Sequence, residues 1–367
     1  MSAARKRPNR SKSRNQSIPC QQLVLTHAES VDQVFAERTT QTNWVEAAFN
    51  NDGNYIRFNV NMPRKLPSRK TGSYAEDPPV SEMGYQTAKL IGRELLDAGV
   101  KLNSILSSPA FRCIQTCRGV LKGLEQTSLP IRLEPGLCDF PHFATTTHGN
   151  PSTVRRVPEY MTAEELIKHG FNVDPLYTPC YSSDQVSTEA DDAVKHHKRC
   201  YKTAEHICQL YPPSRNSSTT VLIVTHPVTL DTLCRKRVGK SDRSPKELQS
   251  LCSNHIATIP PLSLCRMVQR DPTYHDWALS EPPVLPLICR GNRSFQWQVK
   301  FERPSSAVKR HAARTIRTRK RLKLAANRCR WSNDIAGNVT KYGTNLSQHA
   351  NDDASSFSKQ LPLPNLL

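Results

Sequence analysis

The feature that most constrains the fold is a run of four branched apolar residues, Val221-Leu222-Ile223-Val224, followed at once by Thr225-His226. A segment that is apolar at every position leaves no face for water, which predicts a strand buried inside a parallel sheet. Two shorter runs share this character, at residues 23–25 and 104–106. We therefore expect three strands of one buried sheet.

Stretches of helical periodicity separate these strands. Apolar residues recur every three or four positions from Ala110 to Leu124, and Ser108 is a candidate cap for that helix. Two further helices are expected, from Ser81 to Gly99 and over about 191–211. Alternating strands and helices are typical of an α/β domain, so we expect a three-layer sandwich with a central, mainly parallel sheet. Residues 44–80 are expected to form a long insertion with a hairpin turn at 51–53.

Charge divides the chain into a domain and its tails. Residues 1–19 and 331–367 are polar with little to bury, which predicts disorder, the first of them as a basic tail. Residues 303–330 hold eleven basic residues and no acidic one, and their apolar spacing predicts a basic helix. Most of the net charge of +19 comes from these ends, because residues 18–302 carry only +3. We expect one domain over residues 20–302.

The basic segment 303–330 leaves three interpretations open. It is compatible with nuclear import or nucleic-acid binding, with binding to anionic lipid, and with a merely solvated tail. No apolar run approaches the roughly 20 residues needed to cross a bilayer, so we expect no transmembrane segment. We expect an intracellular protein, either cytoplasmic or nuclear.

A side chain capable of chemistry follows each expected strand. Thr26-His27 follows the first strand, Arg112 the second and His226 the third. The carboxyl ends of parallel strands meet at one edge of a sheet, so these residues are expected to converge. Two imidazoles and a guanidinium suit a phosphoryl group, because the guanidinium fork matches phosphate oxygens and an imidazole can attack phosphorus.

No metal or cofactor is expected. The pair His196-His197 has only Cys200 nearby and belongs to no complete ligand set, so we interpret it as part of a solvated helix face. The 14 glycines include no G-x-x-x-x-G-K loop for a nucleotide phosphate.

Seven segments carry a resemblance to a known family: Asp52–Arg57, Asn61–Pro63, Gly84–Ala88, Ser107–Cys113, Glu134–Leu137, Ile223–His226 and Pro282–Leu287. In this order they resemble the histidine phosphatase, or phosphoglycerate mutase-like, superfamily. Within it they are most similar to the phosphatase domain of the suppressor of T-cell receptor signalling proteins, which carry UBA and SH3 domains, and of ecdysteroid-phosphate phosphatase. The resemblance implies a phosphoglycerate mutase-like fold, hydrolysis of phosphomonoesters through a phosphohistidine, and a homodimer.

The resemblance also implies a role for individual residues. His27 falls on the nucleophile and would carry a transient phosphoryl group, and His226 falls on the second histidine of the site. Arg112 falls on a phosphate-binding arginine, and Asp139 on the acid, usually Glu, that protonates the leaving oxygen. Thr26 takes the place of a phosphate-binding arginine and offers only a hydroxyl. The implied ligand is a phosphoprotein or a small phosphomonoester.

The first motif departs from the family. The chain reads Thr26-His27-Ala28-Glu29-Ser30 where the family has Arg-His-Gly-Glu-Arg. Both arginines are absent, and loss of one positioned donor commonly costs about 100- to 1000-fold in rate. Ala28 would add strain if the backbone required a positive φ there. We therefore expect an impaired phosphatase. Two alternatives stay open: an inactive pseudophosphatase that binds a phosphorylated ligand or a protein, and a nucleic-acid-associated protein acting through its basic segment.

Overall fold

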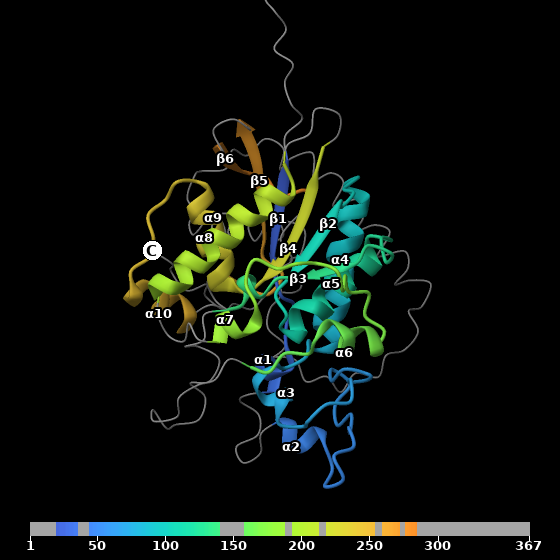
Figure 1. Ribbon diagram of the computed structural model, residues 1–367. Coiled ribbons are helices and arrows are strands. Elements are labelled where there is room, and N and C mark those ends of the chain that lie inside the picture. The colour runs from blue at the N-terminus through green and yellow to red at the C-terminus, as the bar shows by residue number, and fades with distance from the viewer. Residues whose placement is uncertain are drawn as a thin grey trace, which may run out of the picture.

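In the part of the chain that the structure describes, six strands hydrogen-bond into one mixed sheet in the order β3-β2-β4-β1-β5-β6 (Figure 1). The computed structural model describes residues 20–35, 44–139, 158–187, 193–212, 218–253, 259–271 and 276–284. The strands are β1 (Gln21–Thr26), β2 (Ser104–Ser107), β3 (Ile131–Leu133), β4 (Thr220–Thr225), β5 (Leu264–Asp271) and β6 (Asp276–Ser280). β1 pairs in parallel with β4, β4 with β2, and β2 with β3. β5 pairs with β1 and β6 with β5, both antiparallel, and these two strands form one edge of the sheet. The mainly parallel sheet is confirmed, and the three expected strands are β1, β2 and β4.

The helices are α1 (Val31–Phe35), α2 (Trp44–Ala48), α3 (Ser73–Glu76), α4 (Glu82–Asp97), α5 (Phe111–Gly123), α6 (Ala163–Lys168), α7 (Ser183–Ser187), α8 (Ala193–Leu210), α9 (Pro227–Arg237) and α10 (Pro245–Ser253), with one 3₁₀ turn, η1 (Pro135–Leu137). Among these described helices, none is both long and apolar enough to cross a membrane.

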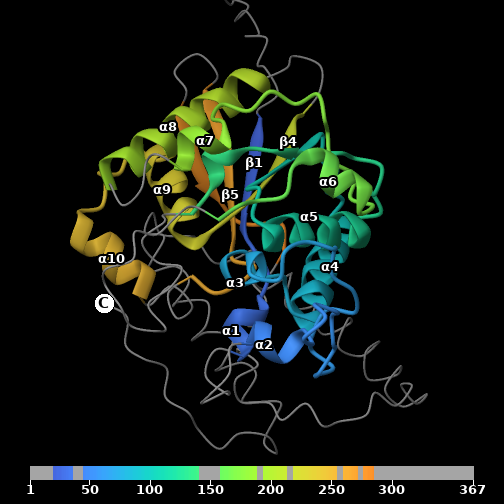
Figure 2. The same ribbon diagram turned by 60° about the horizontal axis from the view of Figure 1, so that its bottom comes forward.

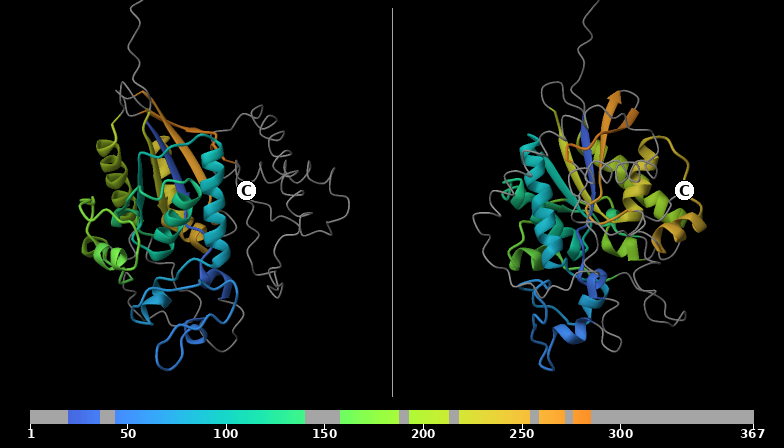
Figure 3. Two further views of the ribbon diagram at one scale, coloured as in Figure 1. Left: turned by 90° about the vertical axis from the view of Figure 1, so that its right-hand side faces the viewer. Right: turned by 180° about the vertical axis from the view of Figure 1, so that it is seen from behind.

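Helices cover both faces of the sheet. Along β1, Leu23 and Leu25 pack into the core that contains α4 and α5, whereas Val24 packs into the core that contains α8 and α9. This division follows from the pleat, since successive side chains of a strand point to opposite faces. The left view of Figure 3 shows the sheet between α8 on one side and α4 on the other. The expected three-layer sandwich is confirmed.

Local chemistry fixes the ends of α4 as expected. The Ser81 hydroxyl accepts a hydrogen bond from the backbone N–H of Gly84, which satisfies one free donor of the first turn. The chain leaves the helix through Gly99 at φ +73°, a conformation that costs glycine little.

The start of α5 differs from the expectation. Ser108 does not cap this helix, which begins at Phe111 after an N-cap residue, Ala110, that has no side-chain cap. Instead, a carboxylate oxygen of Asp77 accepts from the Phe111 N–H over 2.8 Å. The hydroxyl of Ser108 lies instead 2.9 Å from Nε2 of His226.

Residues 44–80 contain two short helices, α2 and α3, besides the expected turn. Gly53 turns the chain at φ +74°, and Phe49 and Tyr55, on either side of it, form an isolated bridge. This region lies beyond the carboxyl ends of the parallel strands, as Figure 2 shows with that end turned forward. The predicted tails at 1–19 and 331–367 and the basic segment 303–330 lie outside the described residues.

Candidate functional site

The two histidines predicted from the strand ends meet in space. His27 follows β1 and His226 follows β4, and their ring centroids lie 5.4 Å apart in an edge-to-face arrangement. The backbone N–H of His27 donates to the carbonyl of Thr225 over 2.8 Å, so the parallel pairing of the two strands continues to the site. Their convergence follows directly from the sheet topology.

A backbone carbonyl selects the tautomer of His27. Nδ1 lies 2.8 Å from the carbonyl oxygen of Ala28, and an oxygen of this kind can only accept. Nδ1 therefore carries the proton, and Nε2 carries the lone pair. A neutral imidazole oriented in this way is the form that can act as a nucleophile.

His226 is fully buried and bonded on both ring nitrogens. Nη2 of Arg112 donates to Nδ1 over 3.1 Å, and Nε2 lies 2.9 Å from the Ser108 hydroxyl. Because a guanidinium can only donate, Nδ1 is unprotonated and Nε2–H donates to Ser108. Burial lowers the pKa of His226 well below its usual range, and the neighbouring positive charge of Arg112 lowers it further. The free site thus holds a neutral imidazole beside a cation.

Asp139 lies at the more open side of these groups. Its Oδ2 is 3.7 Å from Nδ1 of His226, and its side chain is 32 % exposed whereas that of His226 is 0 % exposed. His226 is neutral, so this contact is not an ion pair. A carboxyl group here can reach a leaving oxygen that points toward solvent.

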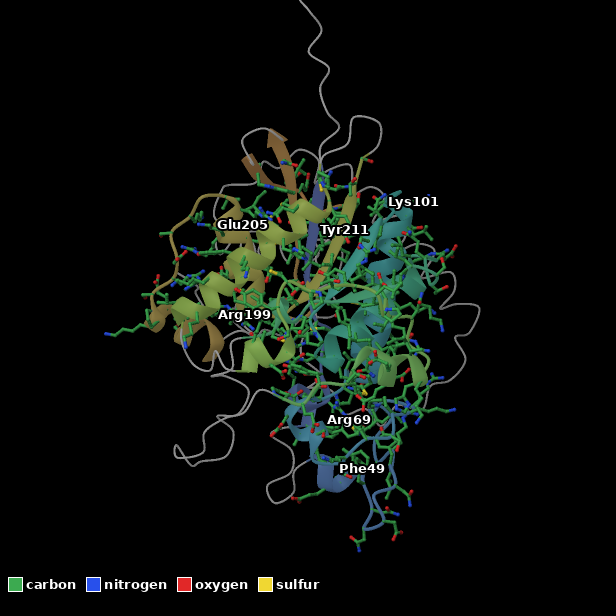
Figure 4. All side chains as sticks on the ribbon, in the orientation of Figure 1. Phe49, Arg69, Lys101, Arg199, Glu205 and Tyr211 are labelled. Carbon is green, nitrogen blue, oxygen red and sulfur yellow. The ribbon has the colours of Figure 1, made fainter. Side chains whose placement is uncertain are left out.

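A buried ion pair supports the helix turn that carries Arg112. Nη1 of Arg69 donates to Asp77 over 2.9 Å, and the other carboxylate oxygen of Asp77 accepts from the N–H of Phe111. The Arg69 guanidinium also lies over the rings of Tyr74, 4.2 Å from its centroid, and Phe111. Figure 4 shows Arg69 close to α3. Arg112 therefore sits on a fixed first turn of α5.

Thr26 lies next to the site but its hydroxyl is bonded elsewhere. It donates to the carbonyl of Pro260 over 3.1 Å and accepts from the N–H of Ser263 over 2.9 Å. Ala28 is not among the residues with positive φ, so the strain considered for that position does not arise. Ser30 is buried, and its backbone N–H donates to the side chain of Gln33.

Three other arginines near the first motif in sequence are bonded away from His27. Arg57 donates to the carbonyls of Met62 and Val60, and Arg64 pairs with Glu82. Arg69 forms the buried pair with Asp77. Among the described arginines of residues 44–80, none has a recorded contact with either site histidine.

The interpretation of His196-His197 as a solvated helix face is wrong. His196 is 2 % and His197 5 % exposed, and the neighbouring Arg199 is 1 % exposed. On α8 the buried positions 193, 196, 200, 204 and 207 recur every three or four residues, so the pair lies on the face that packs against the sheet. This spacing was the signal available in the sequence. Burial lowers the pKa of His196 well below its usual range, and it lies next to the site.

Within the described ranges, no set of three or more His, Cys, Asp or Glu side chains gathers in a way that could hold a metal ion. The thiols near His226 are buried and protonated: burial raises the pKa of Cys113 well above its usual range, and that of Cys138 to about 11. The groups of the site that can act as nucleophile, cation or acid are its imidazoles, its guanidinium and its carboxyl group.

Curated relatives match three quarters of the chain. Over 277 residues it is 33 % identical to the ecdysteroid-phosphate phosphatase of Drosophila melanogaster, covering 75 % of this chain and 33 % of that protein. It is 30 % identical over 279 residues to the human ubiquitin-associated and SH3 domain-containing protein A, covering 75 % of this chain and 39 % of the relative. The chain thus spans between a third and two fifths of the length of these relatives. They agree with the relatives indicated by the sequence motifs.

A solved structure and a family model extend the comparison. The crystal structure of the ecdysone phosphate phosphatase of Bombyx mori in complex with tungstate superposes with a TM-score of 0.59 at 29 % identity, covering 76 % of this chain and 98 % of that one. The model of the histidine phosphatase superfamily (branch 1) matches residues 68–259, a range that includes Arg112, Asp139 and His226 and begins after His27. The chain therefore belongs to the histidine phosphatase superfamily.

Proposed function

We propose that the chain binds phosphomonoesters at the site formed by His27, Arg112 and His226, and that it hydrolyses them slowly through a phosphohistidine at His27. The observation that carries this proposal is the meeting of the His27 and His226 rings, 5.4 Å apart, with Arg112 bonded to His226. The tungstate complex of the Bombyx mori relative supports an oxyanion as the ligand, because tungstate and phosphate are both tetrahedral dianions.

The proposed reaction has two steps, transfer of the phosphoryl group to His27 and hydrolysis of the phosphohistidine, and Asp139 exchanges a proton in each. Nε2 of His27 attacks phosphorus, the bond from phosphorus to the ester oxygen breaks, and Asp139 gives its proton to that oxygen. Water then attacks the phosphohistidine, the nitrogen–phosphorus bond breaks, and the Asp139 carboxylate takes the proton of the water. One water is consumed for each ester, and both residues return to their starting states.

Charge around the phosphoryl group sets the expected rate. Arg112 hydrogen-bonds the site histidine His226, whereas Thr26 and Ser30 add no charge. An arginine that stabilises a phosphoryl transition state is worth about 1000-fold or more. Turnover is therefore expected to be slow.

A second candidate function is binding of a phosphorylated ligand without turnover. The bonding of Arg57, Arg64 and Arg69 away from His27 favours it, because binding a dianion needs less positive charge than stabilising its transition state. Retention of tungstate or phosphate by a protein that releases no phosphate from any ester would establish this candidate.

The substrate class is proposed from the relatives' names. Ecdysteroid-phosphate phosphatase points to a small phosphomonoester, and the ubiquitin-associated and SH3 domain-containing proteins are compatible with a phosphoprotein. A homodimer, nucleic-acid binding through residues 303–330, and a cytoplasmic or nuclear location stay predictions from the sequence.

The test is hydrolysis of p-nitrophenyl phosphate by wild type and His27→Gln. Wild type should release phosphate, and His27→Gln should lower kcat by about 1000-fold or more, to the background, because the nucleophile is gone. His169→Gln, at the end of α6, is the matched control and should leave the rate unchanged. Equal rates in wild type and His27→Gln would overturn the proposal.

A further inference from the structure

Arg199 on α8 is a guanidinium buried beside the site, on the side of the sheet that this helix covers (Figure 4). Its Nη2 donates to the carbonyls of Cys138 and Asp139, at 3.1 and 3.3 Å, and lies 2.9 Å from Nδ1 of His196. Burying a charge costs free energy unless the charge is hydrogen-bonded. These contacts offset that cost and hold the guanidinium of Arg199 in a defined position.

The contacts of Arg199 continue a series along the segment that leads to Asp139. The hydroxyls of Thr225 and Thr229 donate to the two preceding carbonyls, over 2.7 and 3.0 Å. Both threonines flank His226, so this segment is tied to the element that carries the second histidine. Arg199 adds a hydrogen bond to the next carbonyl of the segment, which is that of Asp139.

The position of this carbonyl determines where the carboxyl group can reach. Asp139 places Oδ2 at 3.7 Å from His226, on the more exposed side of the site. An aspartate side chain is one methylene shorter than glutamate, so it compensates less for a displaced backbone. A shift of about 1 Å in a reacting group can cost about 100-fold in rate.

We propose that Arg199 is a positioning residue that holds the backbone of Asp139 and thereby aims its carboxyl group at the leaving oxygen of a phosphomonoester. This inference rests on the proposed hydrolysis, in which Asp139 donates the proton. Nη2 of Arg199 contacts the carbonyls of Cys138 and Asp139 and the ring of His196, so Arg199 acts through the backbone of Asp139.

Leaving groups of different basicity distinguish this role from a merely structural one. p-Nitrophenolate leaves without much help from an acid, whereas the alkoxide of β-glycerophosphate must be protonated as it leaves, and a positioned acid contributes about 100-fold or more. Arg199→Met should therefore lower kcat for β-glycerophosphate by about 100-fold and for p-nitrophenyl phosphate by less than about 5-fold. A general loss of folded protein would lower both rates equally.

Three further variants sharpen the test. Arg199→Lys should recover part of the alkyl-ester rate, since lysine keeps the charge and can donate but lacks the rigid planar guanidinium. In an Asp139→Asn background, Arg199→Met should add less than about 3-fold, because residues that act through one group are not additive. Arg132→Met, which removes a partly buried arginine bonded to Asp174 and Tyr211, is the control and should preserve the ratio of the two rates.

The outcomes separate this inference from the function on which it rests. Selective loss of alkyl-ester turnover in Arg199→Met supports both. Equal loss with the two esters, or no loss in a wild type that turns over both, overturns the role of Arg199 and leaves the proposed hydrolysis standing. A folded wild type that releases phosphate from neither ester overturns both.

Discussion

Arg112 donates from Nη2 to Nδ1 of His226 over 3.1 Å, although 114 residues separate them in the chain. The contact leaves Nδ1 of His226 unprotonated in the free site and holds the guanidinium against the ring that faces His27. An arriving phosphoryl group offers Arg112 a charged acceptor in place of a neutral ring nitrogen, and charge-assisted hydrogen bonds are the stronger kind. For the function proposed above, the free site therefore already positions its cation for a dianion.

Removal of this cation should weaken ligand binding as well as turnover. Arg112→Met is expected to lower kcat/KM for p-nitrophenyl phosphate by about 1000-fold, and Arg112→Lys by less, because lysine keeps the charge without the fork. Tungstate affinity measured by calorimetry should fall in the same order. Arg93→Met, at an exposed pair with Glu125, is the control. Unchanged tungstate binding in Arg112→Met would place the anion elsewhere.

Restoring charge to the first motif should raise the rate. The double variant Thr26→Arg/Ser30→Arg is expected to increase kcat/KM by about 100-fold or more, because it returns two positive groups to the neighbourhood of His27. Thr26→Gln/Ser30→Gln is the matched control, since it adds length and donors without charge. Thermal unfolding of both variants checks folding, because Thr26 and Ser30 are buried. A folded arginine variant with no gain would show that missing charge does not limit the rate.

Buried neutral histidines should make the protein less stable in acid. Burial lowers the pKa of His226 and His196 well below the usual range. In the unfolded chain both take up protons near about pH 6.5, so below this pH the unfolded state binds more protons than the folded state. Stability should be nearly constant above about pH 7 and then fall by up to about 1.4 kcal/mol per pH unit for each histidine.

Urea unfolding between pH 5 and 8 tests whether the stability falls with falling pH, as predicted. His226→Gln and His196→Gln should each flatten the loss of stability below about pH 6.5. His169→Gln, outside the site, is the control variant. If stability rises as the pH falls through this window, the imidazoles are charged in the folded protein and the assignment of a neutral His226 fails.

The buried Arg69–Asp77 pair should contribute to stability far more than a surface pair. Asp77→Asn keeps an oxygen for the N–H of Phe111 but leaves Arg69 without its counter-charge, and the expected loss is about 3 kcal/mol. Arg64→Met breaks a pair in which the arginine is 75 % exposed, and it should cost at most about 1 kcal/mol. Equal losses in chemical denaturation would mean that the buried pair does not anchor α5.

The sequence predicts the centre of the fold better than its edges. β1, β2 and β4 are buried on both faces and therefore read as continuous apolar runs. The edge strand β3 has only three residues, and the apolar residues of β5 are interrupted by Arg266 and Gln269, so neither has that pattern. Their pairing depends on the neighbouring strand, which local sequence does not encode.

The residues of the site likewise fall into those that the sequence predicts and those that it does not. His27, Arg112 and His226 could be placed together because strand ends converge in a parallel sheet. The roles of Ser108 and Arg199 could not be read in advance, because both depend on which partner lies across from them: His226 for Ser108, and the carbonyl of Asp139 for Arg199. A polar side chain on a helix is usually solvated. On α8 such side chains are buried because this face of the helix packs against the sheet.

The most direct test of the account is a rapid alkaline-quench experiment with ³²P-labelled substrate. Wild type quenched during turnover should carry label on one histidine, stable in base and labile in acid as a phosphohistidine is, and peptide mapping should assign it to His27. His27→Gln should carry none, and Asp139→Asn should accumulate more than wild type if loss of the base slows hydrolysis of the intermediate. Turnover by a wild type that carries no label, or label that persists in His27→Gln, would contradict the account.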